Sequence, residues 1–302
     1  MQKIFADAAS QSAFERDGFA VVRLLSAATA TALRGRLEEL EAAAPVALGA
    51  GEALRKSHYH PEAEHRTAMD ALAREAIAAP LASAISGYRL DACMFLTKVP
   101  GAREMNIHRD WTTMADLQQV ALNVWCPLVK VHEGNGTLAV LPGSQILPNV
   151  ETPQVPRFYA PYGDALKKRC VKFDLQPGQA VIYDNRLLHW STTNRSDAPR
   201  PVLRASAVPA EARIVFYRLD SESGGKRFEI LDVAGAGLLA QTPAELAATG
   251  QGGASLGYVA NENRPLSLRE CERLLDRRER AASRGQGFVG GVLKRMTAIL
   301  GA

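Results

Sequence analysis

The sequence predicts a mainly β domain, a sandwich or a barrel, with helices ahead of it. From about residue 89 to 218, short apolar runs are separated by Gly, Pro and Asn, as in all-β domains. Before residue 89, apolar residues recur instead at helical spacing. The 302-residue chain is 47% hydrophobic and 23% charged, which is a globular composition with ample material for a core.

Three helices and one strand are expected before the β region. Residues 10–17 suit a short helix, and GFAVVRLL after it suits a strand that enters the core. Ser26 can cap a longer helix over roughly 27–44, in which leucines recur at helical spacing. Residues 62–86 predict another helix, interrupted at Pro80 because proline removes a backbone donor.

The expected strands of the β region are LDACMFLTKV, VALNVWCPLV, GTLAVLPGS, KFDLQPGQAVIYDN and PVLRASAV. After residue 225 the chain becomes rich in Gly and Ala. Ser267-Leu-Arg-Glu270 is then a capping box that opens a charged helix of about four turns. We therefore expect a domain over 1–225, and a C-terminal extension over 226–302 that packs on the same domain.

Several classes of protein are disfavoured. The formal net charge of +4 is only mildly basic, and no nucleic-acid-binding motif accompanies it. The four cysteines form no C-x-x-C pair, which is typical of reduced thiols in the cytoplasm. No signal-peptide core or run of about 18 apolar residues occurs. The terminal GFVGGVLKRMTAILGA could lie on a membrane surface, but docking on its own domain or on a second subunit is favoured. The oligomeric state stays open.

The chemistry begins with the segment NIHRDW. In a strand, His108 and Asp110 project to one face, which gives two legs of the 2-His-1-carboxylate triad that binds non-haem Fe(II). The third leg must come from one of the other five histidines. His189 is favoured because it ends an apolar strand, whereas His132 lies in a turn-rich segment.

Three protein ligands leave room for a 2-oxoacid and O2 on the iron. If that acid is 2-oxoglutarate, its distal carboxylate needs a fixed cation, and an arginine can pair with both carboxylate oxygens. Arg200 lies eleven residues after His189, at the start of the next expected strand. Arg204 has the same strand parity and is the alternative anchor.

The order of these motifs resembles that of the phytanoyl-CoA dioxygenase family of Fe(II)/2-oxoglutarate oxygenases. FLTKVPG, HRD, NGTLAVLPGSQ and PGQAVIYDNRLLHWSTTNRSDAPR carry the resemblance, which covers about residues 11–218. It implies a double-stranded β-helix (a cupin-like jelly roll) over about 89–220. It also implies Fe(II) as cofactor with 2-oxoglutarate and O2 as cosubstrates.

Carried over position by position, the family pattern implies iron ligands at His108, Asp110 and His189, and 2-oxoglutarate held by Arg200. Ser191 resembles a helper for the same carboxylate, and Lys98 and Trp125 match positions near the cosubstrate. Asn123 shares the strand parity of Trp125 and could reach the near carboxylate.

Some positions depart from the family pattern. Gln145 stands where the family usually has His, Gln179 replaces an Asp, and Trp190 follows the distal His in place of a small residue. An acyl-CoA substrate therefore does not follow from the resemblance. The retained Asp110 disfavours halogenation, since related halogenases have a small residue there.

The predicted function is hydroxylation of a small-molecule metabolite with release of succinate and CO2. The alternatives are a metal-dependent hydrolase on the same triad and a non-catalytic cupin-like binding protein. Arg109, Arg186 and Trp111 adjoin the ligands in sequence and are candidate substrate contacts. The segment SHYHPEAEH could bind Zn or Ni, but a polar loop between helices is favoured.

Overall fold

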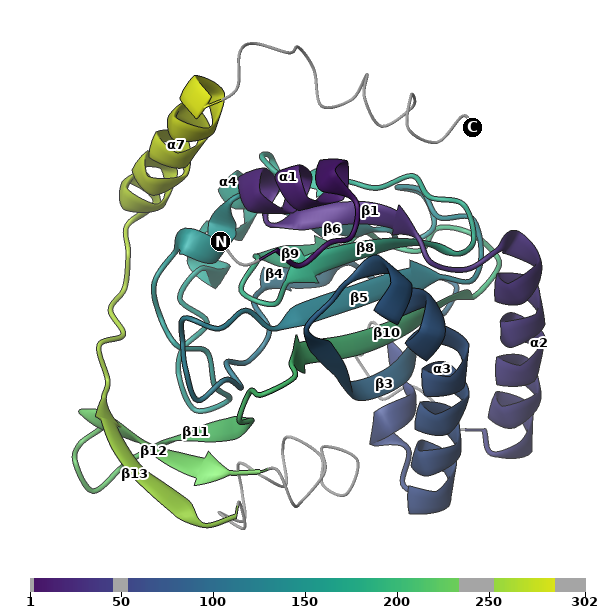
Figure 1. Cartoon of the computed structure of the whole chain (residues 1–302), viewed down its shortest axis with the longest axis horizontal. Coiled ribbons are helices and arrows are strands. Elements are labelled where there is room, and N and C mark those ends of the chain that lie inside the picture. The colour runs from purple at the N-terminus through teal and green to yellow at the C-terminus, as the bar shows by residue number, and fades with distance from the viewer. Residues whose placement is uncertain (1–2, 46–53, 234–252, 286–302) are drawn as a thin grey trace. The chain divides into compact units, whose positions relative to one another are not determined.

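The computed structural model describes residues 3–45, 54–233 and 253–285 (Figure 1). Two compact units divide the chain, Met1–Pro265 and Leu266–Ala302. Within its described part, the first unit holds three antiparallel sheets and the helices that flank them. The predicted fold class is confirmed, because the two larger sheets form the cupin-like jelly roll.

The helices that precede the β region have local causes in the sequence. α1 (Ala8–Asp17) ends at Gly18, whose φ of 83° suits a residue without Cβ. Ser26 caps α2 (Ala27–Ala43), as expected, by accepting a hydrogen bond from the Thr29 amide. The expected interruption at Pro80 is wrong, because α3 (Ala63–Ala84) continues through it. Packing of α3 against the sheet outweighs the lost hydrogen bond.

The larger sheet has six strands in the order β1-β8-β5-β10-β3-β2. All its neighbours are antiparallel, so strands distant in sequence lie side by side. The bounds are β1 (Phe19–Arg23), β2 (Arg55–Lys56), β3 (Tyr88–Lys98), β5 (Leu122–Pro127), β8 (Gln179–Asp184) and β10 (Arg200–Pro209).

The second sheet faces the first and has four short strands in the order β4-β9-β6-β7. They are β4 (Met105–His108), β6 (Leu138–Val140), β7 (Val171–Lys172) and β9 (His189–Ser191). Short helices join the strands: η1 (Ser57–Tyr59), η2 (Ser144–Ile146), η3 (Ala160–Tyr162) and α4 (Gly163–Lys167).

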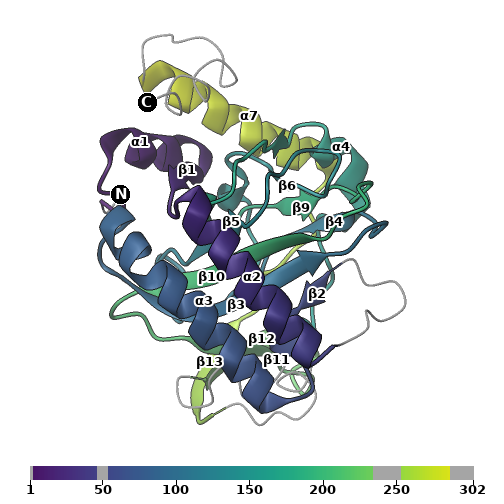
Figure 2. The same ribbon diagram turned by 90° about the vertical axis from the view of Figure 1, so that its right-hand side faces the viewer.

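The two faces of the large sheet have different partners. α2 and α3 cover one face (Figure 2), where Leu37 and Ile77 pack in a cluster with Phe95, Leu203 and Ala205. Because side chains alternate along a strand, the intervening β10 residues project to the opposite face, inside the jelly roll. These residues are Arg200, Val202, Arg204 and Ser206. The hydrophobic packing thereby places two arginines in the interior.

A third sheet follows the jelly roll, with strands β11 (Val215–Leu219), β12 (Arg227–Asp232) and β13 (Ser255–Ala260). β12 and β13 lie after residue 225, and the proposed division there stays a prediction. In the second unit, α7 (Leu268–Gly285) begins with the expected capping box, since Ser267 and Glu270 exchange hydrogen bonds.

None of the described helices is long and apolar enough to cross a membrane. The terminal segment GFVGGVLKRMTAILGA, a candidate for membrane-surface contact, lies outside the described residues.

Candidate metal centre

Two neighbouring strands bring the predicted metal ligands together. His108 ends β4 and is paired in register with His189, which begins β9. Asp110 follows β4 by two residues, and its Oδ1 lies 4.0 Å from His189 Nε2. One ligand atom from each residue lies within 4.8 Å of the others, and this is the one such group in the described residues. The spacing suits a single metal ion.

Main-chain carbonyls orient both imidazoles. The Nδ1 of His108 donates to the carbonyl of Asn106 over 2.8 Å, and the Nδ1 of His189 donates to Leu187 over 2.9 Å. A carbonyl only accepts, so the proton resides on Nδ1 and each Nε2 keeps a lone pair for a metal. Burial, with the neighbouring His189, lowers the pKa of His108 to about 3, so this ring is neutral near pH 7.

Asp110 is held by residues of the large sheet. Its Oδ2 accepts hydrogen bonds from Asn123 Nδ2 over 2.7 Å and from Arg204 Nη2 over 3.1 Å. Burial raises the pKa of this carboxyl, but the charge of Arg204 and the two histidines outweigh it and hold the pKa well below its usual range. Asp110 is therefore an ionised ligand whose Oδ1 remains available.

The two candidate anchor arginines on β10 have different surroundings. Arg204 also donates to Asn123 and Ser206, so its guanidinium is occupied with Asp110 and its neighbours. Arg200 is 1% exposed, and its Nε and Nη1 have no hydrogen-bond partner among the described residues. Its guanidinium lies over the Trp125 ring, and burial lowers its pKa to about 9.

Lys98 is a second buried cation beside Arg200. The two are register partners between β3 and β10, and Lys98 is 0% exposed. Its Nζ donates to Ser191 Oγ over 2.9 Å and to the Thr192 carbonyl over 2.5 Å. Burial, and next the charge of Arg200, lower the pKa of Lys98 to about 7.

Gly136, in the NGT segment, makes room for this lysine. Its φ is +89°, and a Cβ there would lie 2.7 Å from Lys98 Cδ. The lysine stem therefore runs along a stretch of backbone that has no side chain.

The arrangement fits ferrous iron with 2-oxoglutarate. Two imidazoles and one carboxylate form the facial triad of non-haem iron sites. Next to it, a buried guanidinium with unused donors needs an anion, because an unpaired buried charge is strongly disfavoured. A carboxylate that reached Arg200 would satisfy it.

Two of the three predicted substrate contacts are engaged with other groups of the protein. Arg109 is 3% exposed and donates to the carbonyls of Arg186 and Pro148, which favours a structural role. Arg186 pairs with Asp184 over 2.7 Å. Trp111 is half-buried next to the ligand Asp110. Their assignment as substrate contacts stays a prediction.

The histidine-rich segment after residue 56 forms no metal-binding group within the described residues. The His60 and His65 rings stack with centroids 4.0 Å apart. His58 lies close enough to Arg204 to feel its charge, which adds to burial in lowering the pKa of His58 to about 3. The imidazole of His58 is therefore neutral near pH 7.

Two other residues near the metal ligands were missed by sequence reasoning. Tyr183, on β8, packs its buried ring 5.3 Å from the His189 ring. Arg157 donates to the carbonyl of Arg109, between two ligands. Their proximity comes from the fold. Apart from strand parity for Tyr183, it could not be read from sequence spacing.

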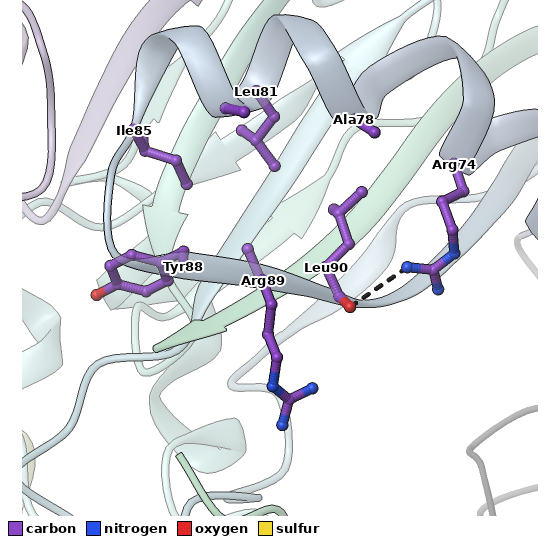
Figure 3. Close-up of a pocket in the computed structure, with 9 residues that line it drawn as sticks. Arg74, Ala78, Leu81, Ile85, Tyr88, Arg89 and Leu90 are labelled. Carbon is purple, nitrogen blue, oxygen red and sulfur yellow. Dashed lines mark hydrogen bonds between the residues drawn. The ribbon is translucent and has the colours of Figure 1, made fainter. Parts of the chain in front are cut away.

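A pocket of about 300 Å³ lies between α3 and the large sheet (Figure 3), on the face that the helices cover. Its two arginines are already engaged. Arg74 donates to the Leu90 carbonyl and pairs with Asp70, and Arg89 donates to Ala212. With no free polar group and none of the metal ligands in its lining, this pocket is not the catalytic centre.

Residues 14–202 match the phytanoyl-CoA dioxygenase (PhyH) family, which is more than half of the chain. The chain belongs to this family. The match spans the described triad and ends just after Arg200. The predicted resemblance is thus confirmed.

Individual proteins show more distant similarity. The dioxygenase Trt7 of Aspergillus terreus is 28% identical over 129 residues, which is 40% of this chain and 41% of Trt7. The chain thus spans less than half the length of that relative. The carbocyclase SnoK of nogalamycin biosynthesis, described as non-haem and α-ketoglutarate-dependent, is 21% identical. It has a TM-score of 0.51 over 71% of this chain and 90% of its own.

HygX of Streptomyces hygroscopicus, solved with nickel and 2-oxoglutarate, is 15% identical. Its TM-score is 0.52 over 68% of this chain and 88% of its own. At these identities the two structures establish the shared fold. Family membership and the described His-Asp-His triad support the predicted class, a 2-oxoglutarate-dependent non-haem iron oxygenase, and its predicted cofactors. They do not select hydroxylation among the reactions of that class.

Proposed function

We propose that this oxygenase hydroxylates a small organic molecule, with His108, Asp110 and His189 holding the ferrous ion and Arg200 holding 2-oxoglutarate. The observation that carries the proposal is the pairing of a preoriented triad with a buried guanidinium that has unused donors. A hydrolase with the same triad would have no use for that cation.

The bound iron, with 2-oxoglutarate and O2, supplies an oxidant that inserts an oxygen atom into a C–H bond while the oxoacid becomes succinate and CO2. The protein's residues position the participants. Arg200 and Lys98 receive the distal carboxylate from one side, and Ser191 contributes a hydroxyl that already contacts Lys98. Trp125 covers the guanidinium and keeps water from it.

The large sheet also maintains the ligand set. Arg204 and Asn123 keep Asp110 ionised and fix which of its oxygens faces the histidines. Asn123 was predicted to contact the near carboxylate of 2-oxoglutarate. Its hydrogen bonds to Asp110 and Arg204 support a ligand-orienting role in the proposal.

The first test is an anaerobic titration of Fe(II) into the purified protein, with and without 2-oxoglutarate, followed by visible absorption. Chelation of the oxoacid on ferrous iron produces a weak charge-transfer band, which we expect for the wild-type protein. His108→Ala should abolish it. Arg200→Met should weaken 2-oxoglutarate binding about 10- to 100-fold, because a charge-assisted contact is lost.

Arg213→Met is the matched control, since the exposed Arg213 pairs with Asp232 and its loss should leave the band unchanged. A folded wild-type protein that binds Fe(II) but gives no band would contradict the proposal and favour the hydrolase. No metal binding would favour a non-catalytic protein.

A second measurement addresses the reaction outcome. SnoK, which has the same fold, is described as a carbocyclase, so the fold does not select between hydroxylation and ring formation. Mass spectrometry of the product separates them, because hydroxylation adds one oxygen atom and ring formation removes two hydrogens. A product that lacks the added oxygen would contradict hydroxylation while leaving the oxygenase class intact.

A further inference from the structure

A cation on the loop between β6 and β7 lies at the metal centre. Arg157 Nη1 donates to the carbonyl of Arg109 over 3.1 Å, and Arg109 is the residue between His108 and Asp110. This contact places the guanidinium beside the backbone that carries two of the metal ligands.

The loop is fastened on either side of Arg157. Before it, the Thr112 amide donates to the Glu151 carbonyl over 2.9 Å, and the Glu151 amide donates to Thr112 Oγ1 over 3.1 Å. After it, the backbone at Gly163 lies so close to β4 that a Cβ there would be 3.3 Å from Ile107 Cγ2. Arg157 is therefore held along the ligand strand by contacts at both ends of its segment.

The charge of Arg157 is available to a ligand. Its side chain is exposed, and among the described residues no carboxylate lies within 4.0 Å of it. The acid of the same loop, Glu151, is buried at 3% exposure and makes no ion pair with it in that set. By contrast, Arg213 pairs with Asp232 and Arg227 with Asp220.

The geometry of the guanidinium specifies the partner. The bond to the Arg109 carbonyl uses Nη1, which leaves the edge formed by Nε and Nη2. Two parallel N–H groups on that edge match the two oxygens of a carboxylate. In the proposed function, 2-oxoglutarate is held by Arg200 and Lys98, so its carboxylates do not account for Arg157.

We propose that the primary substrate is an organic carboxylic acid whose carboxylate pairs with Arg157 at the rim of the metal centre. This inference rests on the proposed function. The ion pair fixes one end of the substrate next to His108, so that a C–H bond a few atoms away faces the metal. Arg157 is thus a specificity-determining residue from a segment distant from every ligand in sequence.

The test compares acids with their primary amides, which have nearly the same shape without the charge. Probes are a panel of matched pairs of increasing length, beginning with 3-phenylpropanoic acid and octanoic acid. Binding is measured by the change in the Fe(II)–2-oxoglutarate band under anaerobic conditions, and independently by calorimetry on the metal-free protein. The proteins are the wild type, Arg157→Gln, Arg157→Lys and the control Arg23→Gln, in which the exchanged residue ends β1.

We expect at least one acid to bind the wild type and Arg23→Gln about tenfold or more tightly than its amide. Arg157→Gln should remove that preference, and Arg157→Lys should restore part of it, because the charge returns without the two-donor edge. The affinity for 2-oxoglutarate should be the same in all four proteins.

The results separate the inference from the proposed function. If the band forms but no acid is preferred across the panel, or the preference survives in Arg157→Gln, the carboxylate assignment is overturned and the oxygenase assignment stands. If the band does not form in the wild type, the proposed function itself fails. A loss of 2-oxoglutarate affinity in Arg157→Gln would assign Arg157 to the cosubstrate and overturn the inference.

Discussion

At the residue scale, two arginines on one face of β10 have different partners. Arg204 is bonded to Asp110 and Asn123, whereas Arg200 is buried with unused donors. The sequence identified both, because they share strand parity after the distal histidine. It could not choose between them, because the choice depends on which one Asp110 reaches across the interior.

Lys98 should make the affinity for 2-oxoglutarate depend on pH. Its pKa is lowered to about 7, so the free protein loses this charge as the pH rises above 7. A bound carboxylate favours the charged form and raises that pKa, so binding must then take up a proton. We expect the affinity for 2-oxoglutarate to fall by up to about tenfold per pH unit above 7, measured by the charge-transfer titration.

Lys98→Met should flatten this profile and weaken binding below pH 7, where the wild type has its full charge. Calorimetry in buffers of different ionisation enthalpy should show proton uptake near pH 8 in the wild type. An affinity independent of pH between 6.5 and 8.5 would contradict the role of Lys98. Lys226→Met, at an exposed lysine just before β12, serves as the control.

Sequence reasoning found the residues that lie in ordered motifs. The triad residues come together as the resemblance implied. Lys98 contacts Ser191 in the structure, and the roles of all these residues on iron and 2-oxoglutarate stay predictions. Arg157 was missed because its contact with the Arg109 carbonyl joins segments whose proximity only the tertiary fold creates. Every residue has a backbone carbonyl, so the sequence does not show which carbonyl accepts a hydrogen bond from a distant side chain.

At the scale of elements, strand alternation connects the core to the site. In β10, Leu203 and Ala205 pack in the cluster with the helices, while Arg204 between them bonds to Asp110. The apolar runs therefore predicted most strands of the large sheet. The course of α3 through Pro80 was not predicted, because a local preference gave way to packing of Ile77 and Leu81 in the core.

Gly136, in the NGT segment before β6, should matter for both stability and 2-oxoglutarate binding. Gly136→Ala adds a Cβ 2.7 Å from Lys98 Cδ and forces a residue with a side chain to keep a φ of +89°. We expect the free energy of unfolding to fall by about 1–3 kcal/mol. Affinity for 2-oxoglutarate should fall as well, because Lys98 must shift.

Urea denaturation measures the first effect and the charge-transfer titration the second. Gly35→Ala is the control, because a Cβ there meets no atom within 4 Å. If Gly136→Ala unfolded at the wild-type urea concentration, the close packing against Lys98 would not be present in solution.

At the scale of the whole molecule, ligand binding should stabilise the fold. Fe(II) and 2-oxoglutarate bind a site assembled from both jelly-roll sheets, which the unfolded chain does not possess. At a hundred times its Kd, one ligand adds about 2.7 kcal/mol to the free energy of unfolding. For a chain of 302 residues this corresponds to a rise in Tm of about 4 °C.

Anaerobic thermal scans with Fe(II), with 2-oxoglutarate and with both would measure this rise. The increment from Fe(II) should vanish in His108→Ala, and the increment from 2-oxoglutarate should shrink in Arg200→Met. Equal increments in wild type and variants would mean that the ligands stabilise the protein from another site.

The two jelly-roll sheets contribute different parts of the site, and this separation has a consequence for evolution. The two histidine ligands belong to the small sheet, in β4 and β9, whereas the buried cation pair belongs to β3 and β10 of the large sheet. Replacement of Arg200 and Lys98 during evolution would therefore remove the proposed 2-oxoglutarate site but keep the two histidines that hold the metal. Metal-binding relatives without oxygenase activity could arise from this scaffold by two substitutions in one sheet.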